Sequence, residues 1–422
     1  MNPAHAAAVH APPGLDRCPL MPTYGAPTTM FVRGAGTELW DAEGGRYLDF
    51  LSGLAVTSLG HAHPAVTEAL SRQAATLVHT SNLFATEHAA PLATALDRLV
   101  GDGAPAGGQV FFANSGAEAN ECAIKLARRF GGSGLRGLNG QGGLRGPNGM
   151  RGKHTVVSAL GSFHGRTLAT LHATGQPARH EAFQPLPEGF RHVAWLDVDA
   201  LAAACDPTIV AAVLLESVQG EGGVNPATAD YFVAVRRLCD ERGILFMVDE
   251  VQTGLARTGR WFGFHHLGVV PDVVTMAKAL GNGVPIGACW ARADVAAAFE
   301  PGDHATTFGG NPLAAAAARA VVGELERIDA PARATAQGAR LTAALRELPG
   351  VIAVRGLGLL LAAELAPGID AKAVVADALA AGLVVNAVSP SALRLAPPLT
   401  VADAEIDEAV AILTTVLSEL PA

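Results

Sequence analysis

Three charged side chains stand at the ends of apolar segments, where an isolated charge is costly. Glu216 ends the run TIVAAVLLE, Asp249 follows the apolar part of GILFMVDEV, and Lys278 ends PDVVTMAK. Moving a carboxylate or an ammonium group into an apolar interior without a partner is strongly unfavourable, so such residues usually belong to a site that uses them. For Asp249 and Lys278 the alternative is a structural ion pair between the two.

A second chemical signal lies in the stretch FFANSGAEANECAIKLARRF (111–130). Ser115 is followed three residues later by Glu118, which is the pattern of a capping box and predicts a helix that begins at Gly116 or Ala117. Free N–H groups and the positive dipole end of such a helix suit a phosphate group. A capped helix without a ligand is the alternative, and for this stretch taken alone it is the more common case.

A phosphate cradle, a buried carboxylate and a buried lysine together match the requirements of one cofactor, pyridoxal phosphate. The lysine forms a Schiff base with the aldehyde of the cofactor. The carboxylate keeps the pyridine nitrogen protonated, so that the ring can withdraw electrons, and the helix N-terminus holds the phosphate. We therefore expect Lys278, Asp249 and the residues from Ser115 to Ala117 to meet in one site.

The pattern around these residues predicts the elements that position them. Continuous apolar runs at 208–216, 243–251 and 271–278, with a helical stretch at Tyr231–Arg242 between the first two, are typical of parallel strands covered by helices on both faces. In such α/β sheets, ligands bind at the carboxyl ends of the strands. The three charged residues lie at or near those ends.

Changes in texture along the chain predict its domains. The segment FVRGAGTELWDAEGGRYLDF alternates as a β-meander does, and we expect residues 1–60 to pack with a small α/β domain formed by residues 312–422. Residues 61–311 then form a large cofactor-binding domain. Within it, residues 131–152 contain ten glycines in 22 residues and few apolar anchors, which predicts a surface insertion that bulges outward.

Composition excludes several classes of protein. The 422 residues can bury a large core, and a net charge of −9 without a basic patch gives no reason to expect a nucleic-acid partner. The N-terminal residues lack a secretory signal pattern, and no apolar stretch of about 18 residues predicts a membrane span. Five scattered cysteines without a CxxC pair fit a reducing, cytoplasmic compartment and no structural metal.

From about residue 20 to the C-terminus the chain resembles a class III aminotransferase of the fold-type I pyridoxal-phosphate enzymes, and it is most similar to the acetylornithine aminotransferases. The resemblance implies a mostly parallel, seven-stranded-type sheet in a large domain and a smaller α/β domain formed by the N- and C-terminal parts. The matching stretches are YLDFLSGLAVTSLGHAHP, HTSNLFATE, FFANSGAEANECAIKLAR, SFHGRT, VQGEGGV, VDEVQTGLARTG, PDVVTMAKALGNGVPIGA, TTFGGNPLA and LRLAPPL.

The resemblance also implies a set of cofactor residues. Lys278 would bind the cofactor covalently and move the proton, and Asp249 would pair with the pyridine nitrogen. Thr307 would reach the phosphate of the other subunit's cofactor, which makes the protein a homodimer with sites at the subunit interface. The other implied cofactor residues are Val251 and Phe163 against the ring, Gln252 at its hydroxyl group, and Ser115, Gly116 and Ala117 at the phosphate.

Substrate-binding roles are implied in the same way. Arg166 would bind a substrate α-carboxylate, with Thr306 beside the substrate. Glu221 would neutralise Arg394 while the amino donor is bound and swing away when 2-oxoglutarate arrives. Leu54 stands where ornithine aminotransferases carry a tyrosine, which favours acetylornithine as the donor.

The implied reaction moves the δ-amino group of N2-acetyl-L-ornithine to 2-oxoglutarate, a step of arginine biosynthesis that gives N-acetyl-L-glutamate 5-semialdehyde and L-glutamate. Ornithine, succinylornithine and 4-aminobutyrate stay open as donors, because an apolar pocket discriminates weakly between similar chains. A non-catalytic pyridoxal-phosphate-binding protein is the alternative of another class, and the filled catalytic positions disfavour it. The chain departs from the family pattern at Ser217 and Val218, where Pro-Ile is usual, and in the 131–152 insertion.

Overall fold

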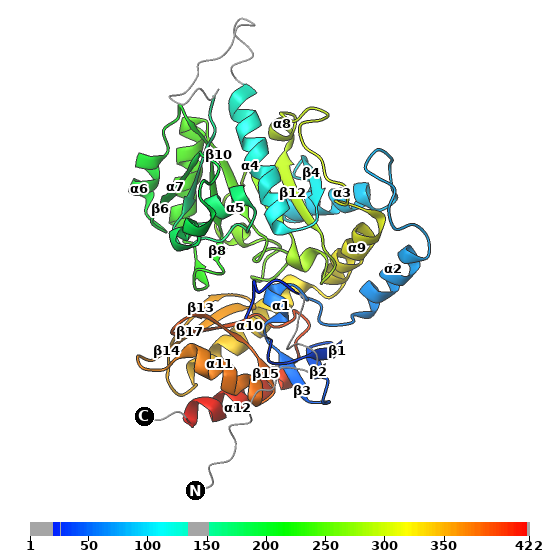
Figure 1. Cartoon of the computed structure of the whole chain (residues 1–422), viewed down its shortest axis with the longest axis vertical. Coiled ribbons are helices and arrows are strands. Elements are labelled where there is room, and N and C mark those ends of the chain that lie inside the picture. The colour runs from blue at the N-terminus through cyan, green and yellow to red at the C-terminus, as the bar shows by residue number, and fades with distance from the viewer. Residues whose placement is uncertain (1–19, 26, 134–151, 420–422) are drawn as a thin grey trace, which may run out of the picture.

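The computed structural model describes residues 20–25, 27–133 and 152–419, which form two lobes (Figure 1). One lobe contains the strands labelled β4, β10 and β12, and the other contains β1 to β3 together with the C-terminal elements β13 to β17. Residues 134–151 of the predicted glycine-rich insertion lie outside the described residues. Its start is not irregular, because Gly131 and Gly132 continue helix α4 (Gly116–Ser133).

The larger lobe is built on one seven-stranded sheet. Only β12 runs antiparallel to its neighbours, which confirms the mostly parallel sheet. The three predicted strands are present as β7, β10 and β11, and each begins two residues after the start of the apolar run that predicted it. Every residue of these strands is buried. In spatial order the strands are β4 (Gly108–Ala113), β12 (Gly287–Arg292), β11 (Val273–Met276), β10 (Leu245–Asp249), β7 (Val210–Glu216), β5 (Thr155–Ala159) and β6 (Phe190–Val193).

Helices cover this sheet, and α4 lies across its centre against β4, β7, β11 and β12. Helix α7 shows how the sequence sets the ends: the Thr228 side chain accepts a hydrogen bond from the Tyr231 N–H, and Gly243 ends the helix at a φ of 58°. The other helices of this lobe are α2 (Pro64–Ala74), α3 (Ala89–Val100), α5 (Leu168–Ala173), α6 (Val198–Ala204), α8 (Ala293–Ala296) and α9 (Pro312–Arg327), with 3-10 turns η1 (Pro177–Arg179), η2 (Glu181–Phe183), η3 (Gly263–His266) and η4 (Lys278–Leu280). The sequence predicts a small domain that begins at residue 312, but α9 packs against α2 and α3, so the lobes divide after this helix.

The smaller lobe joins segments from both ends of the described chain. The predicted meander is present and antiparallel, and its last strand pairs with β15 of the C-terminal part, with Leu48 opposite Leu383. The second sheet of this lobe is wholly antiparallel, in the order β13-β14-β17-β16. The strands are β1 (Phe31–Ala35), β2 (Glu38–Asp41), β3 (Arg46–Asp49), β13 (Val351–Leu357), β14 (Leu360–Leu365), β15 (Leu383–Val384), β16 (Asn386–Ser389) and β17 (Ala392–Leu395), and the helices are α10 (Ala330–Arg346), α11 (Ala371–Ala380) and α12 (Asp403–Ser418).

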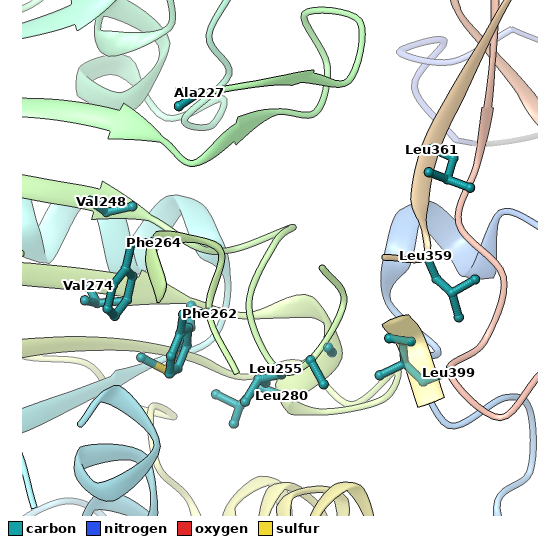
Figure 2. Close-up of a cluster of buried hydrophobic side chains, with 14 of the residues drawn as sticks. Ala227, Val248, Leu255, Phe262, Phe264, Val274, Leu280, Leu359, Leu361 and Leu399 are labelled. Carbon is teal, nitrogen blue, oxygen red and sulfur yellow. The ribbon is translucent and has the colours of Figure 1, made fainter. Parts of the chain in front are cut away.

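Two short elements and one continuous core connect the lobes. The turn α1 (Ser52–Ala55) and the small ribbon β8 (Val218–Gln219) and β9 (Asn225–Pro226) lie at the joint. The main apolar cluster runs from the large sheet across this joint, and Figure 2 shows its members on both sides, among them Phe262 and Leu399. No helix among the described residues is both long and apolar enough to cross a membrane.

Three imidazole rings cluster beside the sheet edge, and one of them, that of His192, makes stability depend on pH. The rings of His172, His180 and His192 have centroids 5.4, 5.7 and 6.2 Å apart. Desolvation by burial lowers the pKa of His192 from 6.5 to about 4. Because the unfolded chain then binds a proton more readily than the folded one, the stability that neutral His192 provides is present above pH 6.5 and is lost as pH falls towards 4.

We expect the thermal unfolding midpoint to fall over this pH range, and to fall less in a His192→Gln variant. Glutamine keeps a donor for the His172 carbonyl, which His192 Nε2 contacts at 2.8 Å, and it does not titrate. The measurement is a series of unfolding curves between pH 8 and 4 for both proteins. Parallel curves would show that His192 does not contribute to the acid sensitivity.

Candidate active site

A cavity of about 380 Å³ opens at the carboxyl ends of β7, β10 and β11. Glu216, Asp249 and Lys278, the three charged residues that end the predicted strands, all line it. The parallel strands bring these residues together because their ends meet at one edge of the sheet. The position agrees with the site expected from the sequence.

Lys278 follows β11 and begins the short turn η4. Its φ of 42° lies in the left-handed region, which non-glycine residues seldom adopt outside constrained sites. Desolvation by burial lowers its pKa from 10.5 to about 8, although the charge of Glu221 acts in the opposite direction. A substantial fraction of the amine is therefore neutral near pH 8, which a nucleophile requires.

Asp249 ends β10 and is held by a hydrogen-bond network instead of an ion pair with Lys278. Its Oδ2 accepts from Asn120 Nδ2 at 2.7 Å and lies 2.9 Å from His164 Nδ1, while Oδ1 accepts from the backbone N–H of Val251 at 3.0 Å. Asn120 is fixed in turn by the hydroxyl group of Thr275, which donates to its Oδ1 at 2.6 Å. The carboxylate is 4% exposed and its orientation is fixed from three sides.

The N-terminus of α4 closes another side of the cavity. The helix begins at Gly116, as predicted, and Ser115 Oγ accepts from the Glu118 N–H at 3.2 Å. The Glu118 carboxylate does not return to Ser115, however, but accepts from the Asn114 N–H at 2.8 Å. A Cβ on Gly116 would lie 2.7 Å from a methyl carbon of Val251, so this position requires glycine and keeps the helix end close to the loop after Asp249.

Phe163 and Arg166 enter the cavity on the loop between β5 and α5. The Phe163 N–H donates to Glu216 Oε2 at 3.2 Å, and the Arg166 guanidinium carbon lies 5.5 Å from the centroid of the Phe163 ring. Thr167 caps α5 immediately afterwards, and its hydroxyl group donates to Glu121 at 2.5 Å. The loop is therefore anchored at both ends.

Glu221 and Arg394 form an ion pair that joins the lobes. Arg394 Nη1 lies 2.5 Å from Glu221 Oε1, its Nε donates to Asn386 at 3.0 Å, and Gln252 Oε1 is 3.3 Å from Nη1. Arg394 is 1% exposed, and its Nη2 has no partner among the described residues. Desolvation opposes the change, but the charge and hydrogen bond of Arg394 keep the pKa of Glu221 below its usual value.

Sequence reasoning assigned no role to several residues that complete this site. Glu216 is buried, and both desolvation and the charge of Asp249 raise its pKa well above the usual value. Its second oxygen accepts from the Gly220 N–H at 3.3 Å, so one carboxyl group ties the Phe163 loop to the Glu221 loop. Asn120 could have been noticed, because it lies four residues after Gly116 and is a polar residue on the buried face of α4.

Four predicted substrate or cofactor residues do not line this cavity within one chain, namely Thr306, Thr307, Leu54 and Arg394, although Arg394 contacts the lining residues Glu221 and Gln252. Thr306 and Thr307 line a neighbouring cavity of about 410 Å³, where Thr306 Oγ1 accepts from Asn114 Nδ2 at 3.2 Å. Leu54 is 38% exposed and lies on the left-handed turn of α1, whereas Val56 lines the main cavity. The roles of Thr306, Thr307 and Leu54 stay predictions.

The arrangement fits a flat aromatic aldehyde that carries a phosphate. An amine with a lowered pKa, a fixed carboxylate and a helix N-terminus surround a cavity with Phe163 and Val251 among its walls. The contact of Gly116 with Val251 keeps the helix end near that wall. The residues present therefore fit pyridoxal phosphate, with Lys278, Asp249 and Ser115–Ala117 as the residues that would hold it.

Comparisons with known proteins agree with this arrangement. The chain is 48% identical to an acetylornithine aminotransferase of Caldanaerobacter subterraneus over 407 residues, 95% of this chain and 98% of that protein. Among solved structures it is similar to the ornithine aminotransferase of Toxoplasma gondii, with a TM-score of 0.86, 34% identity and coverage of 96% and 93%. It is also similar to the N-acetylornithine aminotransferase of Stenotrophomonas maltophilia, with a TM-score of 0.77, 35% identity and coverage of 92% and 95%.

The match to a family extends over nearly the whole described chain. Residues 21–417 match the aminotransferase class-III family, so both lobes and the site between them are included. A second structure of the Toxoplasma gondii enzyme is described as having partial occupancy of PLP at its active site. The site, the fold and this match agree, and the chain belongs to the class III aminotransferases.

Proposed function

We propose that this protein is an acetylornithine aminotransferase that uses pyridoxal phosphate, transferring the δ-amino group of N2-acetyl-L-ornithine to 2-oxoglutarate. The Glu221–Arg394 pair beside Lys278 carries the proposal, because an arginine that can be neutralised or released lets one site accept two different substrates. Curated relatives with this activity are 46–48% identical to the chain, which supports the choice of donor.

In this mechanism the cofactor, when bound, supplies an electron sink next to the substrate carbon. Lys278 holds and moves the proton at Nζ, and the pKa of about 8 lets the same amine act as base and acid near neutral pH. The carboxylate of Asp249 is held in one orientation, because Asn120 and His164 both contact its Oδ2. Phe163 and Val251 present apolar surface to the cavity, and they limit the access of water to the parts of it that they line.

Substrate carboxylates are recognised by two arginines in this proposal. Arg166 lines the cavity and offers a planar guanidinium group to the α-carboxylate of the donor. Glu221 occupies Arg394 during that half-reaction, and 2-oxoglutarate displaces Glu221 in the next. We propose in addition that Leu54 favours acetylornithine over ornithine.

A homodimer is part of the proposed function. Thr307 is exposed, and Asn82 Nδ2 donates to the carbonyl oxygens of Thr306 and Gly309, each at 3.1 Å. Large apolar side chains are exposed on these two neighbouring segments, and such a group on a soluble protein marks an interaction surface. They are Leu83 at 86%, Phe84 at 66% and Phe308 at 59% exposed. We also propose a cytoplasmic location, because the proposed reaction is a step of arginine biosynthesis.

The proposed donor can be tested by following the visible absorbance of the purified, cofactor-loaded protein. We expect the cofactor band to fall rapidly when N2-acetylornithine is added alone and to return when 2-oxoglutarate follows. The control is the same titration with ornithine and 4-aminobutyrate. A band that ignores acetylornithine but responds to one of these would keep the aminotransferase chemistry and replace the donor.

A further inference from the structure

Arg257 is a fully buried cation that the proposed mechanism does not use. It belongs to the stretch VDEVQTGLARTG and is 0% exposed. Carbonyl and hydroxyl oxygens, instead of a carboxylate, accept the hydrogen bonds of its guanidinium group, and its Nε has no partner among the described residues. Burying a charge in this way is costly, so the retained arginine needs a reason.

The acceptors of Arg257 all lie across the joint between the lobes. Nη1 donates to the carbonyl oxygens of Leu359 at 3.1 Å and Pro397 at 2.5 Å, and Nη2 donates to Ser58 Oγ at 3.0 Å. The contact is close, because a Cβ on Gly358 would lie only 2.7 Å from the Arg257 carbonyl oxygen. One side chain of the large lobe therefore binds two segments of the smaller lobe and Ser58, which follows α1 at the joint.

These segments lead directly to the substrate side of the site. Pro397 lies three residues after Arg394, and Leu359 immediately precedes β14, whose Ala362 pairs with Arg394 in the sheet. Within its own segment of the large lobe, Arg257 lies five residues after Gln252, whose Oε1 is 3.3 Å from Arg394 Nη1. Figure 2 shows apolar side chains on both sides of the joint, with Leu255 towards the large lobe and Leu359 and Leu399 towards the small one.

We propose that Arg257 is a positioning residue that sets the separation between the cofactor half of the site and Arg394. The apolar contacts of the joint are not directional, whereas three hydrogen bonds from one planar group fix both distance and orientation. Arg257 acts through the ends of β14 and β17, and it touches neither substrate nor cofactor in this arrangement. The kinetic consequence rests on the proposed function, because it assumes that Arg394 binds 2-oxoglutarate.

The test compares the two half-reactions in a full-length, cofactor-loaded Arg257→Met variant. Methionine removes the charge and the hydrogen bonds while retaining an unbranched chain. We expect the KM for 2-oxoglutarate to rise about tenfold, with the donor half-reaction within about twofold of the parent, because a displaced group loses only the interactions that it makes itself. An unchanged KM for 2-oxoglutarate, or an equal loss in both half-reactions, would overturn the proposal.

Arg242→Met is the matched control. Arg242 Nη1 also donates to two carbonyl oxygens, those of Ala202 at 2.5 Å and Cys205 at 2.8 Å, but all three residues belong to the large lobe. We expect this variant to unfold at a lower temperature without a selective change in the KM for 2-oxoglutarate. A selective change of the same size in the control would contradict the assignment to Arg257.

Amide hydrogen exchange provides a readout that does not depend on turnover. Peptides covering 357–365 and 392–399 should exchange faster in Arg257→Met than in Arg242→Met, and unchanged protection would overturn the proposal. If the parent protein does not use 2-oxoglutarate, the proposed function fails while the exchange result still decides the role of Arg257. If Arg257→Met does not fold, Arg257→Lys and Ser58→Ala should show smaller shifts in the same direction, and no shift in either would count against it.

Discussion

Replacing Lys278 with alanine is expected to lower transamination by at least about 10³-fold, because the variant would lack the amine that we propose as nucleophile and proton-transfer group. The structure gives a physical reason for so large an effect. The pKa of about 8 follows from burial at this one position, and the φ of 42° directs the side chain from a turn that few residues tolerate. A neighbouring side chain cannot supply the same group. The measurement is the steady-state rate with acetylornithine and 2-oxoglutarate.

Lys372→Ala is a suitable control for this loss, because Lys372 lies on α11 of the smaller lobe and away from the cavity. It should transaminate at the parental rate. Folding of Lys278→Ala can be verified by its thermal unfolding midpoint, which we expect to be equal to or higher than that of the cofactor-free parent, since a desolvated amine is removed. A Lys278→Ala variant that turned over near the parental rate would refute the mechanism.

The second large effect is expected for Asp249→Asn. The side chain would keep its shape but could no longer act as the carboxylate that we propose for the protonated ring nitrogen, so kcat should fall about 10²- to 10³-fold. Its new amide group also faces two donors, because Asn120 Nδ2 and His164 Nδ1 lie 2.7 and 2.9 Å from Oδ2 in the parent. The measurements are kcat and the visible spectrum of the bound cofactor.

Asp272→Asn separates a catalytic carboxylate from a structural one. Asp272 is 3% exposed, precedes the neighbouring strand β11, and pairs with Arg236 and Arg292, each at 3.0 Å. Breaking this buried network should lower the unfolding midpoint and leave kcat of the folded protein near its parental value. If Asp249→Asn and Asp272→Asn lost activity and stability in the same proportion, Asp249 would have only a structural role.

The sequence predicts those parts of the site that depend on strand ends. A continuous apolar run that ends in a charged residue fixes both the strand and the edge at which Glu216, Asp249 and Lys278 meet. It does not predict which polar groups face them from other elements. Asn120 reaches Asp249 from α4 and His164 reaches it from the loop after β5, and these contacts depend on how the helix and loop pack on the sheet.

The sequence predicts least well the residues that lie outside the main cavity. Thr306 and Thr307 lie in a separate cavity of one chain, and Leu54 lies on a turn whose four residues all have positive φ values, which no local pattern indicates. Only one half of the predicted capping box at Ser115 forms. Ser115 Oγ accepts from the Glu118 N–H, but the Glu118 carboxylate accepts from the N–H of Asn114 instead of that of Ser115.

The pairing of β3 with β15 bears on how the chain matures during synthesis. Leu48 finds its partner Leu383 only 335 residues later in the sequence. At ordinary elongation rates, the edge of β3 stays uncovered for on the order of 20 to 70 s on the ribosome. An unpaired strand edge can join another nascent chain, so a chaperone that covered this meander during synthesis would improve the yield of native enzyme.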